Sequence, residues 1–359
     1  MPVDRSTRAN PTSGEDGTAP PDRCRLCGEA GRFARYQLRE MLFGTRESFE
    51  YVRCPVCGVL QIVTIPVDLA RHYPPDYYGP AALVPEAPRS GRLRSMARRG
   101  RDHAALFGRS ALERNVAARL RGPREDGWVR SFVRRTELQS FRDPILDVGC
   151  GRMPGALASL QAVGFRNLRG IDPFLEEDGV WRGIPLARSS IHECVGDYQL
   201  VMMHHSFEHM PDPVEVMASA RRLLRPNGAV LLRTPVMGTW FWDHYGAHWW
   251  ELDAPRHLFV HSVESLRRCA DAAGLELFDV VWDSSFEEMI ASEQIARDVA
   301  WREPASWSVT PPAGFSDGTI ESYRDWVAAL NGSGNAGRAG FYFRPGVTIG
   351  SDSKSRTSV

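Results

Sequence analysis

P-I-L-D-V-G-C-G-R-M-P-G, residues 144–155, combines a short apolar run with a glycine-rich turn. Ile145, Leu146 and Val148 give the run expected of a buried parallel strand, and the Ala/Leu-rich residues after Gly155 predict a helix. A glycine-rich turn between strand and helix lets a ligand approach the backbone and meet the amide donors at the helix start. The stretch therefore predicts the ligand-binding turn of an α/β fold.

A second apolar run, L-R-G-I, ends in an acid at Asp172, about twenty residues after the glycine-rich turn. An acid at the tip of the second strand is well placed to accept hydrogen bonds from both hydroxyls of a ribose. The nicotinamide fingerprint G-x-G-x-x-G is not matched, because Met153 and Pro154 precede Gly155. A dinucleotide-binding or purely structural turn is the alternative interpretation.

On the D-x-G-C-G motif and the later acid, the sequence resembles the class I S-adenosylmethionine-dependent methyltransferases, whose first motif has the form D-x-G-x-G. R-L-L-R-P-N-G at residues 222–228 also matches the family's R-L-L-x-P-x-G turn before its fifth strand. The resemblance covers roughly residues 140–345 and implies an α/β fold with a doubly wound, seven-stranded Rossmann-like sheet.

The same resemblance implies a binding site for S-adenosylmethionine. Gly149, Gly151 and the nearby backbone should bracket the methionine part of the cofactor, Asp147 should order the loop, and Asp172 should hold the ribose. The expected cofactor-binding residues are Asp147, Gly149, Cys150, Gly151, Asp172 and His204.

Strand and helix patterns alternate along this part of the chain, as in a doubly wound sheet. Strands are expected at 144–149, up to Asp172, and at 184–187, 198–203, 229–233 and 275–282, with a final antiparallel strand at 340–344. Helices are expected near 155–163, after Asp212-Pro213, and at 262–273.

A polar cluster, H-H-S-F-E-H at residues 204–209, follows the fourth expected strand. Ligands of open α/β sheets bind outside the carboxyl ends of the strands. Methyl transfer from a sulfonium is an in-line displacement, and an alcohol nucleophile must also lose a proton, for which histidine is the natural base. The candidates for substrate deprotonation or binding are His205, Glu208, His209 and His257.

His205, Glu208 and His209 also spell H-x-x-E-H, which within a helix is an inverted zinc-protease motif. We reject that interpretation, because a strand-like run precedes the motif and P-D-P at residues 211–213 would break a helix. The stretch resembles ubiquinone-pathway O-methyltransferases as well, whose E-x-x-E-H holds a divalent ion. His205 replaces the first glutamate, so we do not expect a metal here, although two histidines and a carboxylate can bind one.

Residues 236–260 concentrate tryptophan, tyrosine and histidine and predict a lid over the substrate. Exposed aromatic faces stack on sugar rings or planar bases, and Asp253 and Arg256 could add polar contacts. In the alternative interpretation, the aromatic side chains pack together in a small satellite core.

Cys24, Cys27, Cys54 and Cys57 form two C-x-x-C-G knuckles. Two thiolates three residues apart can grip one ion, and the following glycine lets backbone amides point at the sulfurs. Four sulfurs complete a tetrahedron, so the expected Zn²⁺ is structural and stabilises a zinc-ribbon-like module too small to fold by apolar burial. A thioredoxin-like dithiol would need only one such pair, near a βαβ unit.

The 359 residues are expected to form five parts. These are a disordered tail (1–22), a zinc-binding module (23–79), a basic helical linker (80–138), the methyltransferase domain (139–345) and a second disordered tail (346–359). The linker is either a solvated helical hairpin or an anchor for phosphates.

Composition limits the possible functions. The formal net charge is zero, so no global field attracts nucleic acid or membrane, and no apolar run is long enough to span a bilayer. Seven cysteines with paired spacing, and no secretion signal, predict a reducing cytoplasm.

We therefore expect a cytoplasmic, zinc-stabilised methyltransferase with a small acceptor, a sugar or another hydroxylated metabolite. The four-cysteine module beside this fold resembles bacterial methyltransferases of polysaccharide and sugar biosynthesis. One alternative is an RNA base methyltransferase that grips RNA with the zinc module and linker. Another is a non-catalytic binding module of the same fold. The sequence leaves the acceptor atom and the oligomeric state open.

Overall fold

The computed structural model describes residues 22–346, apart from gaps at 75–76 and 78–102 and most of 105–131. The two expected tails and most of the expected basic linker therefore lie outside the described residues. Among the described residues, the helices are too short or too polar to cross a bilayer.

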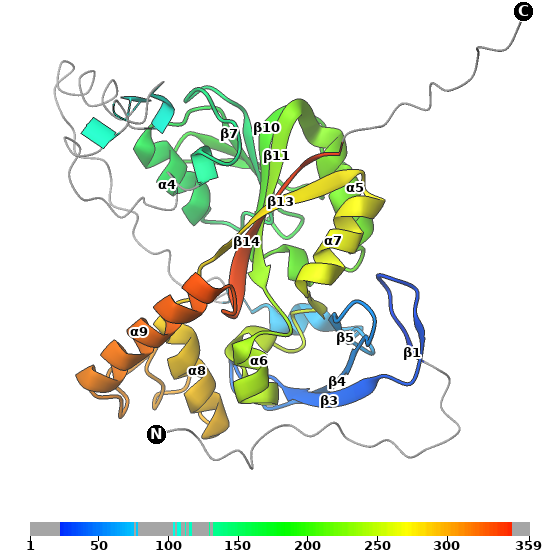
Figure 1. Ribbon diagram of the computed structural model, residues 1–359, viewed down its shortest axis with the longest axis vertical. Helices are drawn as coiled ribbons and strands as arrows, with labels where there is room; N and C mark the ends of the chain where they lie inside the picture. The colour runs from blue at the N-terminus through cyan, green and yellow to red at the C-terminus, as the bar shows by residue number, and fades with distance from the viewer. Residues whose placement is uncertain are drawn as a thin grey trace, which may run out of the picture.

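An eight-stranded sheet in the order β13-β14-β11-β10-β6-β7-β9-β8 forms the centre of the larger lobe (Figure 1). Its strands are β6 (Ile145–Val148), β7 (Leu168–Ile171), β8 (Gly179–Trp181), β9 (Ile184–Ala187), β10 (Tyr198–His204), β11 (Leu224–Pro235), β13 (Leu275–Trp282) and β14 (Arg338–Pro345). The five strands from β11 to β9 are parallel, whereas β14 is antiparallel to both of its neighbours and β8 is antiparallel to β9. This is the mixed α/β, Rossmann-like sheet expected.

The seven strands expected from the sequence are all present, and α4 (Gly155–Val163) has the expected bounds. The strand count was nevertheless wrong by one, because β8 adds an eighth strand at the sheet edge among the described residues. Two of its three residues are exposed, so the sequence has no apolar pattern there that predicts a strand.

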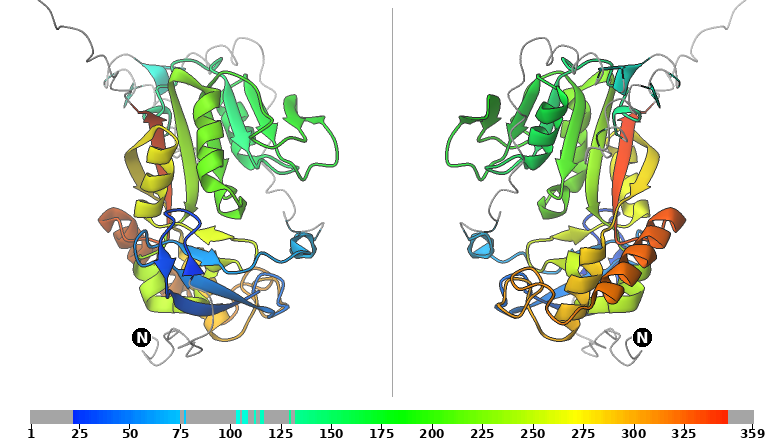
Figure 2. Two further views of the ribbon diagram at one scale, coloured as in Figure 1. Left: turned by 90° about the vertical axis from the view of Figure 1, so that its right-hand side faces the viewer. Right: turned by 90° about the vertical axis from the view of Figure 1, so that its left-hand side faces the viewer.

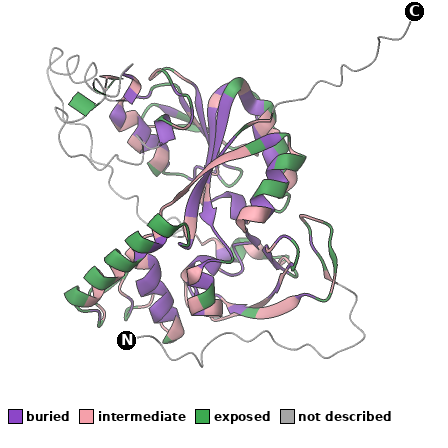
Figure 3. Cartoon of the chain, in the orientation of Figure 1, coloured by how far each residue is buried: buried purple, intermediate pink, exposed green. Residues whose placement is uncertain are grey.

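The residues of the central strands are mostly buried (Figure 3), because helices cover each side of the sheet. Side chains alternate between the faces along each strand. Leu146 and Val148 pack in the cluster that holds α5 (Pro213–Leu223) and α7 (Val263–Ala272). Ile145 packs in the cluster that holds α4.

The N-terminal segment folds as short strands at one end of the large sheet (Figure 2). They are β1 (Asp22–Arg23), β2 (Ala30–Gly31), β3 (Ala34–Arg39), β4 (Ser48–Arg53) and β5 (Leu60–Ile62), followed by the 3-10 helix η2 (Leu69–His72). β12 (Phe259–Val260), which comes from the insertion after β11, pairs with β5 and completes a four-stranded sheet. The N-terminal segment and the insertion thus share one sheet.

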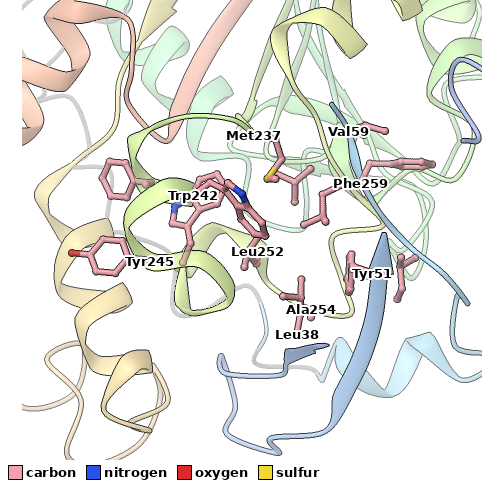
Figure 4. Close-up of a cluster of buried hydrophobic side chains, with 14 of the residues drawn as sticks. Leu38, Tyr51, Val59, Met237, Trp242, Tyr245, Leu252, Ala254 and Phe259 are labelled. Atoms are coloured by element: carbon pink, nitrogen blue, oxygen red, sulfur yellow. The ribbon is translucent and has the colours of Figure 1, made fainter. Parts of the chain in front are cut away.

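They also share one core, drawn in Figure 4. Leu38 and Tyr51 of the N-terminal strands pack with insertion residues, including Trp242, Leu252 and Phe259. Most of the insertion's aromatic side chains are therefore buried, which confirms the satellite-core alternative for Phe241, Trp242, Tyr245 and Trp249.

The insertion contains α6 (Trp240–Tyr245), η4 (Gly246–His248) and η5 (Trp250–Leu252). Two helices that the sequence patterns did not predict, α8 (Phe286–Ala296) and α9 (Asp317–Ser333), complete this smaller lobe (Figure 1). α8 contacts η4, η5 and α6, so it packs against all three helices of the insertion.

Candidate active site

The turn after β6 contains two glycines, so part of its backbone is not covered by side chains. Gly149 and Gly151 have φ angles of 74° and 65°, in the left-handed region that favours glycine. A Cβ atom on Gly149 would lie 2.4 Å from the Cβ of Ser206. Ser206 is itself fixed, because its hydroxyl donates a 2.7 Å hydrogen bond to the carbonyl of Val148. The chain after β10 therefore packs directly on the glycine turn.

Asp172, the first residue after β7, lies against this turn as predicted. Its carboxylate accepts a hydrogen bond from the N–H of Gly151 at 3.0 Å and another from the N–H of Phe174 at 2.8 Å. Burial raises the pKa of Asp172, while these two hydrogen bonds act in the opposite direction. The acid and the glycine turn form one unit.

Asp147 is a second buried carboxyl group beside this unit. Burial, and next the charge of Asp172, raise its pKa to about 8. The two acids thus place buried negative charge under the turn whenever both are ionised.

Cys150, in the turn itself, points its sulfur toward the sheet, since a Cβ on Gly170 would lie 2.6 Å from that sulfur.

Two adjoining cavities open on the turn. The Asp172 cavity, of about 310 Å³, is lined on one side by Tyr73, Asp172, Phe174, Ser190 and Ile191. The histidine cavity, of about 520 Å³, is lined by Leu42, Gly151, Trp181, His204, Trp250, Glu251 and His257, among others. Both cavities are bounded by Tyr77, Gly149, His205 and His209. A ligand that filled both would pass over the glycine turn.

His205 lies at the junction of the cavities, but both of its ring nitrogens face other groups. Its Nε2 is 2.7 Å from Arg233 Nη1, and Arg233 is in turn paired with Asp283. Because a guanidinium only donates, His205 Nε2 accepts, and the ring proton lies on Nδ1. That Nδ1 faces Glu208 Oε1 at 3.4 Å, a contact longer than an ordinary hydrogen bond. His205 is therefore poorly placed to take a proton from an acceptor.

Glu208, in the 3-10 helix η3 (Phe207–His209), is completely buried. Among the described residues, neither of its carboxylate oxygens has a hydrogen-bond partner of normal length. His257 Nε2 lies 3.9 Å from Oε1. Burial alone would raise the pKa of Glu208, but His205, His257 and His209 together lower it. The carboxylate is thus a buried anion that depends on the surrounding imidazoles.

His209 and His257 pack edge to face beside this carboxylate, with ring centroids 4.7 Å apart. His209 Nδ1 is 2.9 Å from the carbonyl of Arg256, and His257 Nδ1 is 2.8 Å from the carbonyl of Glu251. A carbonyl only accepts, so each Nδ1 donates and each Nε2 keeps its lone pair. Burial, and next the electrostatic interaction with His257, lower the pKa of His209 to about 4.

Ligating atoms of Glu208, His209 and His257 all lie within 4.8 Å of one another, and this group could hold a metal ion. Such a set differs from the H-x-x-E-H set of the sequence, because His205 turns to Arg233 and His257 takes its place. The Nδ1–H groups held by backbone carbonyls are typical of metal-binding histidines.

His204 ends β10 and lines the histidine cavity, as well as a further cavity of about 610 Å³ beside α4. Burial lowers its pKa to about 3, so it is neutral near pH 7. Arg233, which sequence reasoning missed, is paired in register with His204 on the neighbouring strand β11. The common end of two parallel strands was the signal that could have indicated it.

The four paired cysteines converge. Sγ of Cys24 lies 3.6 Å from Sγ of Cys57, and Sγ of Cys27 lies 3.6 Å from Sγ of Cys54. Tetrahedral zinc with bonds of about 2.3 Å separates sulfurs by about 3.8 Å, so this arrangement fits the ion. In each knuckle the glycine N–H donates to the carbonyl of the first cysteine, at 3.0 Å.

Comparisons with known proteins agree with the fold. A family model described as a methyltransferase domain matches residues 95–280. The chain is 34% identical over 103 residues to a ubiquinone biosynthesis O-methyltransferase of Pseudomonas aeruginosa (strain UCBPP-PA14), covering 25% of this chain and 43% of that protein. It is 32% identical over 106 residues to the same enzyme of Aeromonas salmonicida (strain A449), covering 26% of this chain and 44% of that protein.

The matched region thus spans less than half the length of these curated relatives. Among solved structures, a coclaurine N-methyltransferase is 13% identical, with a TM-score of 0.38, and the match covers 61% of this chain and 70% of that one.

Proposed function

The chain belongs to the methyltransferase-domain family, and we propose that it transfers a methyl group from S-adenosylmethionine to a hydroxyl of a small, ring-shaped acceptor. The observation that carries this proposal is the Gly149–Gly151 turn, bonded to the Asp172 carboxylate and open to a histidine-lined cavity. It offers bare backbone and an acid on one side, and proton-accepting groups on the other.

The cofactor would lie across the turn, with its nucleoside in the Asp172 cavity. There Asp172 accepts hydrogen bonds from the ribose hydroxyls, and Ser190 and Ile191 lie close enough to border the base. The buried carboxyl of Asp147 favours the positive charges of the methionine end. The methyl group would then point into the histidine cavity.

The acceptor would occupy the histidine cavity, whose aromatic walls include Tyr77, Trp181 and Trp250. Such walls fit a flat or sugar ring, and the O-methyltransferase names of the curated relatives support a hydroxyl as the nucleophile. A sugar and a hydroxylated aromatic ring both satisfy this lining.

His257 is the best-placed base. Its Nδ1–H is fixed by the carbonyl of Glu251, and its Nε2 carries the lone pair. Bound S-adenosylmethionine would supply the methyl group from its sulfonium, with S-adenosylhomocysteine as the other product. His257 Nε2 would accept the proton of the acceptor hydroxyl during the transfer, and the Glu208 carboxylate would stabilise the resulting imidazolium.

Glu208, His209 and His257 could instead hold a divalent ion, which would supply Lewis-acid activation of the acceptor hydroxyl. In the part of the chain that the structure describes, neither Glu208 carboxylate oxygen has a hydrogen-bond partner of normal length, and His209 and His257 keep the lone pairs of their Nε2 atoms; both features favour metal binding. At the other end of the chain, the four cysteine sulfurs would hold a structural zinc ion.

The test has two steps. Calorimetry should show one S-adenosylmethionine bound per chain, and transfer from methyl-labelled cofactor should then be assayed on nucleotide sugars, free sugars and hydroxylated aromatic acids. Transfer that requires the acceptor hydroxyl supports the proposal. Transfer only to RNA, with affinity falling steeply with salt, would establish the RNA alternative instead. Cofactor binding without transfer to any of these would favour a non-catalytic module.

A further inference from the structure

The side chains that fix His209 and His257 come from the N-terminal segment and not from the sheet that carries the cofactor turn. Tyr73, which follows η2, places its hydroxyl 3.0 Å from His209 Nδ1. The same hydroxyl lies 3.5 Å from the carbonyl of Arg256, which also bonds His209. His209 Nδ1 is therefore enclosed by one N-terminal side chain and one carbonyl of the insertion.

That carbonyl is itself held by an ion pair to the N-terminal segment. Arg256 and Glu40 are both completely buried, with Arg256 Nη2 2.7 Å from Glu40 Oε1. Arg256 also pairs with Asp253 and donates to the carbonyl of His72 at 3.2 Å. Glu40 accepts N–H groups of Leu42, Phe43 and Thr45, so its carboxylate cannot swing away without losing them.

His257 is anchored from the same side. The hydroxyl of Tyr51, a completely buried residue of β4, donates a 2.8 Å hydrogen bond to the carbonyl of His257 (Figure 4 shows Tyr51 in the shared core). The pairing of β12 with β5 begins two residues later, at Phe259. The backbone from Asp253 to Phe259 is thus clamped by N-terminal groups.

The cofactor turn has different supports. Gly149 and Cys150 donate to the carbonyl of Ile171, Gly151 donates to Asp172, and Ser206 packs on Gly149. All of these groups belong to the large sheet or to the loops that follow its strands. Damage to the N-terminal contacts should therefore leave the cofactor turn in place.

We propose that Tyr73 and the Glu40–Arg256 ion pair position His209 and His257. Through these contacts the N-terminal segment, which also carries the four cysteines, orients the two histidines that act on the acceptor. This rests on the proposed function for its catalytic consequence, but the orientation itself is a property of the folded chain. The N-terminal segment then belongs to the catalytic centre and is more than a separate stabilising module.

The test uses full-length, metal-loaded protein and Tyr73→Phe. This change removes one hydroxyl and keeps the ring, which lines the Asp172 cavity and stacks on Phe174, so the cofactor side of Tyr73 is preserved. The expected result is a fall in kcat of about fivefold, the value of one hydrogen bond, with acceptor KM and cofactor Kd changed less than twofold. Tyr36→Phe is the matched control, because Tyr36 lies on β3 and its ring packs on Trp242, away from the histidines. It should keep wild-type kcat.

A second readout needs no acceptor. In ¹⁵N-histidine NMR spectra, His209 should be a single Nδ1–H tautomer in the wild type and a mixture of tautomers in the variant Tyr73→Phe/Glu40→Gln. Wild-type kcat in Tyr73→Phe, or an unchanged tautomer in the double variant, would overturn the proposal. Equal losses of kcat and cofactor affinity in a folded Tyr73→Phe protein would also overturn it. Failure of the proposed function would appear differently, as a wild type that transfers no methyl group.

Discussion

The backbone N–H of Gly151 donates a hydrogen bond to the Asp172 carboxylate across 3.0 Å, joining the turn after β6 to the end of β7. The two residues are separated by a helix in the sequence, and the parallel pairing of β6 with β7 brings them together. The bare turn and the acid therefore depend on each other.

Gly149→Ala should abolish cofactor binding. The new Cβ would lie 2.4 Å from the Cβ of Ser206, and alanine is strained at a φ of 74°. Gly155→Ala is the matched control, because a Cβ there meets nothing within 4 Å. Calorimetry should find wild-type affinity for S-adenosylmethionine in Gly155→Ala and none in Gly149→Ala. Equal affinities in the two variants would contradict the role of the bare turn.

The affinity for S-adenosylmethionine should rise with pH and level off above about pH 8. Asp147 has its pKa raised to about 8 by burial and by Asp172, so below that pH it is protonated in the free protein. A cationic ligand favours the ionised carboxyl, and its binding must then release a proton. Titrations in buffers of different ionisation enthalpy measure that release.

Asp147→Asn provides the control for this pH dependence, since the amide does not titrate. The variant should lose most of the slope between pH 6.5 and 8.5. The same raised pKa means that the contribution of Asp147 to folding stability decreases as pH rises from about 4 to about 8. A slope that persists unchanged in Asp147→Asn would assign the proton to another group.

His257→Gln should lower kcat by about 10²- to 10⁴-fold while cofactor affinity stays within twofold, because His257 lies in the histidine cavity and outside the Asp172 cavity. His205→Gln should cost less, since its Nε2 already accepts from Arg233. Rates with labelled cofactor measure both. A larger loss in His205→Gln than in His257→Gln would reverse the assignment of the base. If a chelator lowers the rate of the wild-type protein and an added divalent ion restores it, the metal-assisted mechanism is favoured.

One zinc ion per chain should be found by metal analysis. Cys54→Ser should lower that content and the free energy of unfolding, because the sulfur set loses one ligand. Cys194→Ser is the matched control, since Cys194 is also a buried free cysteine but lies outside the cluster. Unchanged zinc content in Cys54→Ser would show that the four sulfurs do not act together.

Local patterns predicted the large sheet well, because central parallel strands are continuous apolar runs and α4 has clear boundaries. α8 escaped prediction for a physical reason. Eight of its eleven residues are buried, including Glu288, so it lacks the one-sided apolar pattern of a surface helix. Arg338, on the distant strand β14, pairs with Glu288, and a local pattern cannot show that partner.

Sequence reasoning gathered most of the candidate site but could not rank its histidines. His205, Glu208 and His209 lie close together in the sequence, whereas the structure turns His205 to Arg233 and brings His257 from the insertion. Such a choice depends on strand register and on a two-residue strand pairing, β12 with β5. Neither leaves a periodic signal in the sequence.

The most direct test of the central claim is a calorimetric titration of S-adenosylmethionine into wild-type protein, Asp172→Ala and the control Asp271→Ala, whose carboxylate lies on an exposed position of α7. The account predicts one bound cofactor per wild-type chain. It also predicts at least a tenfold weaker Kd in Asp172→Ala, the cost of losing charged hydrogen bonds to the ribose, and wild-type Kd in Asp271→Ala. Absence of binding to folded, zinc-loaded wild type, or undiminished affinity in Asp172→Ala, would contradict it.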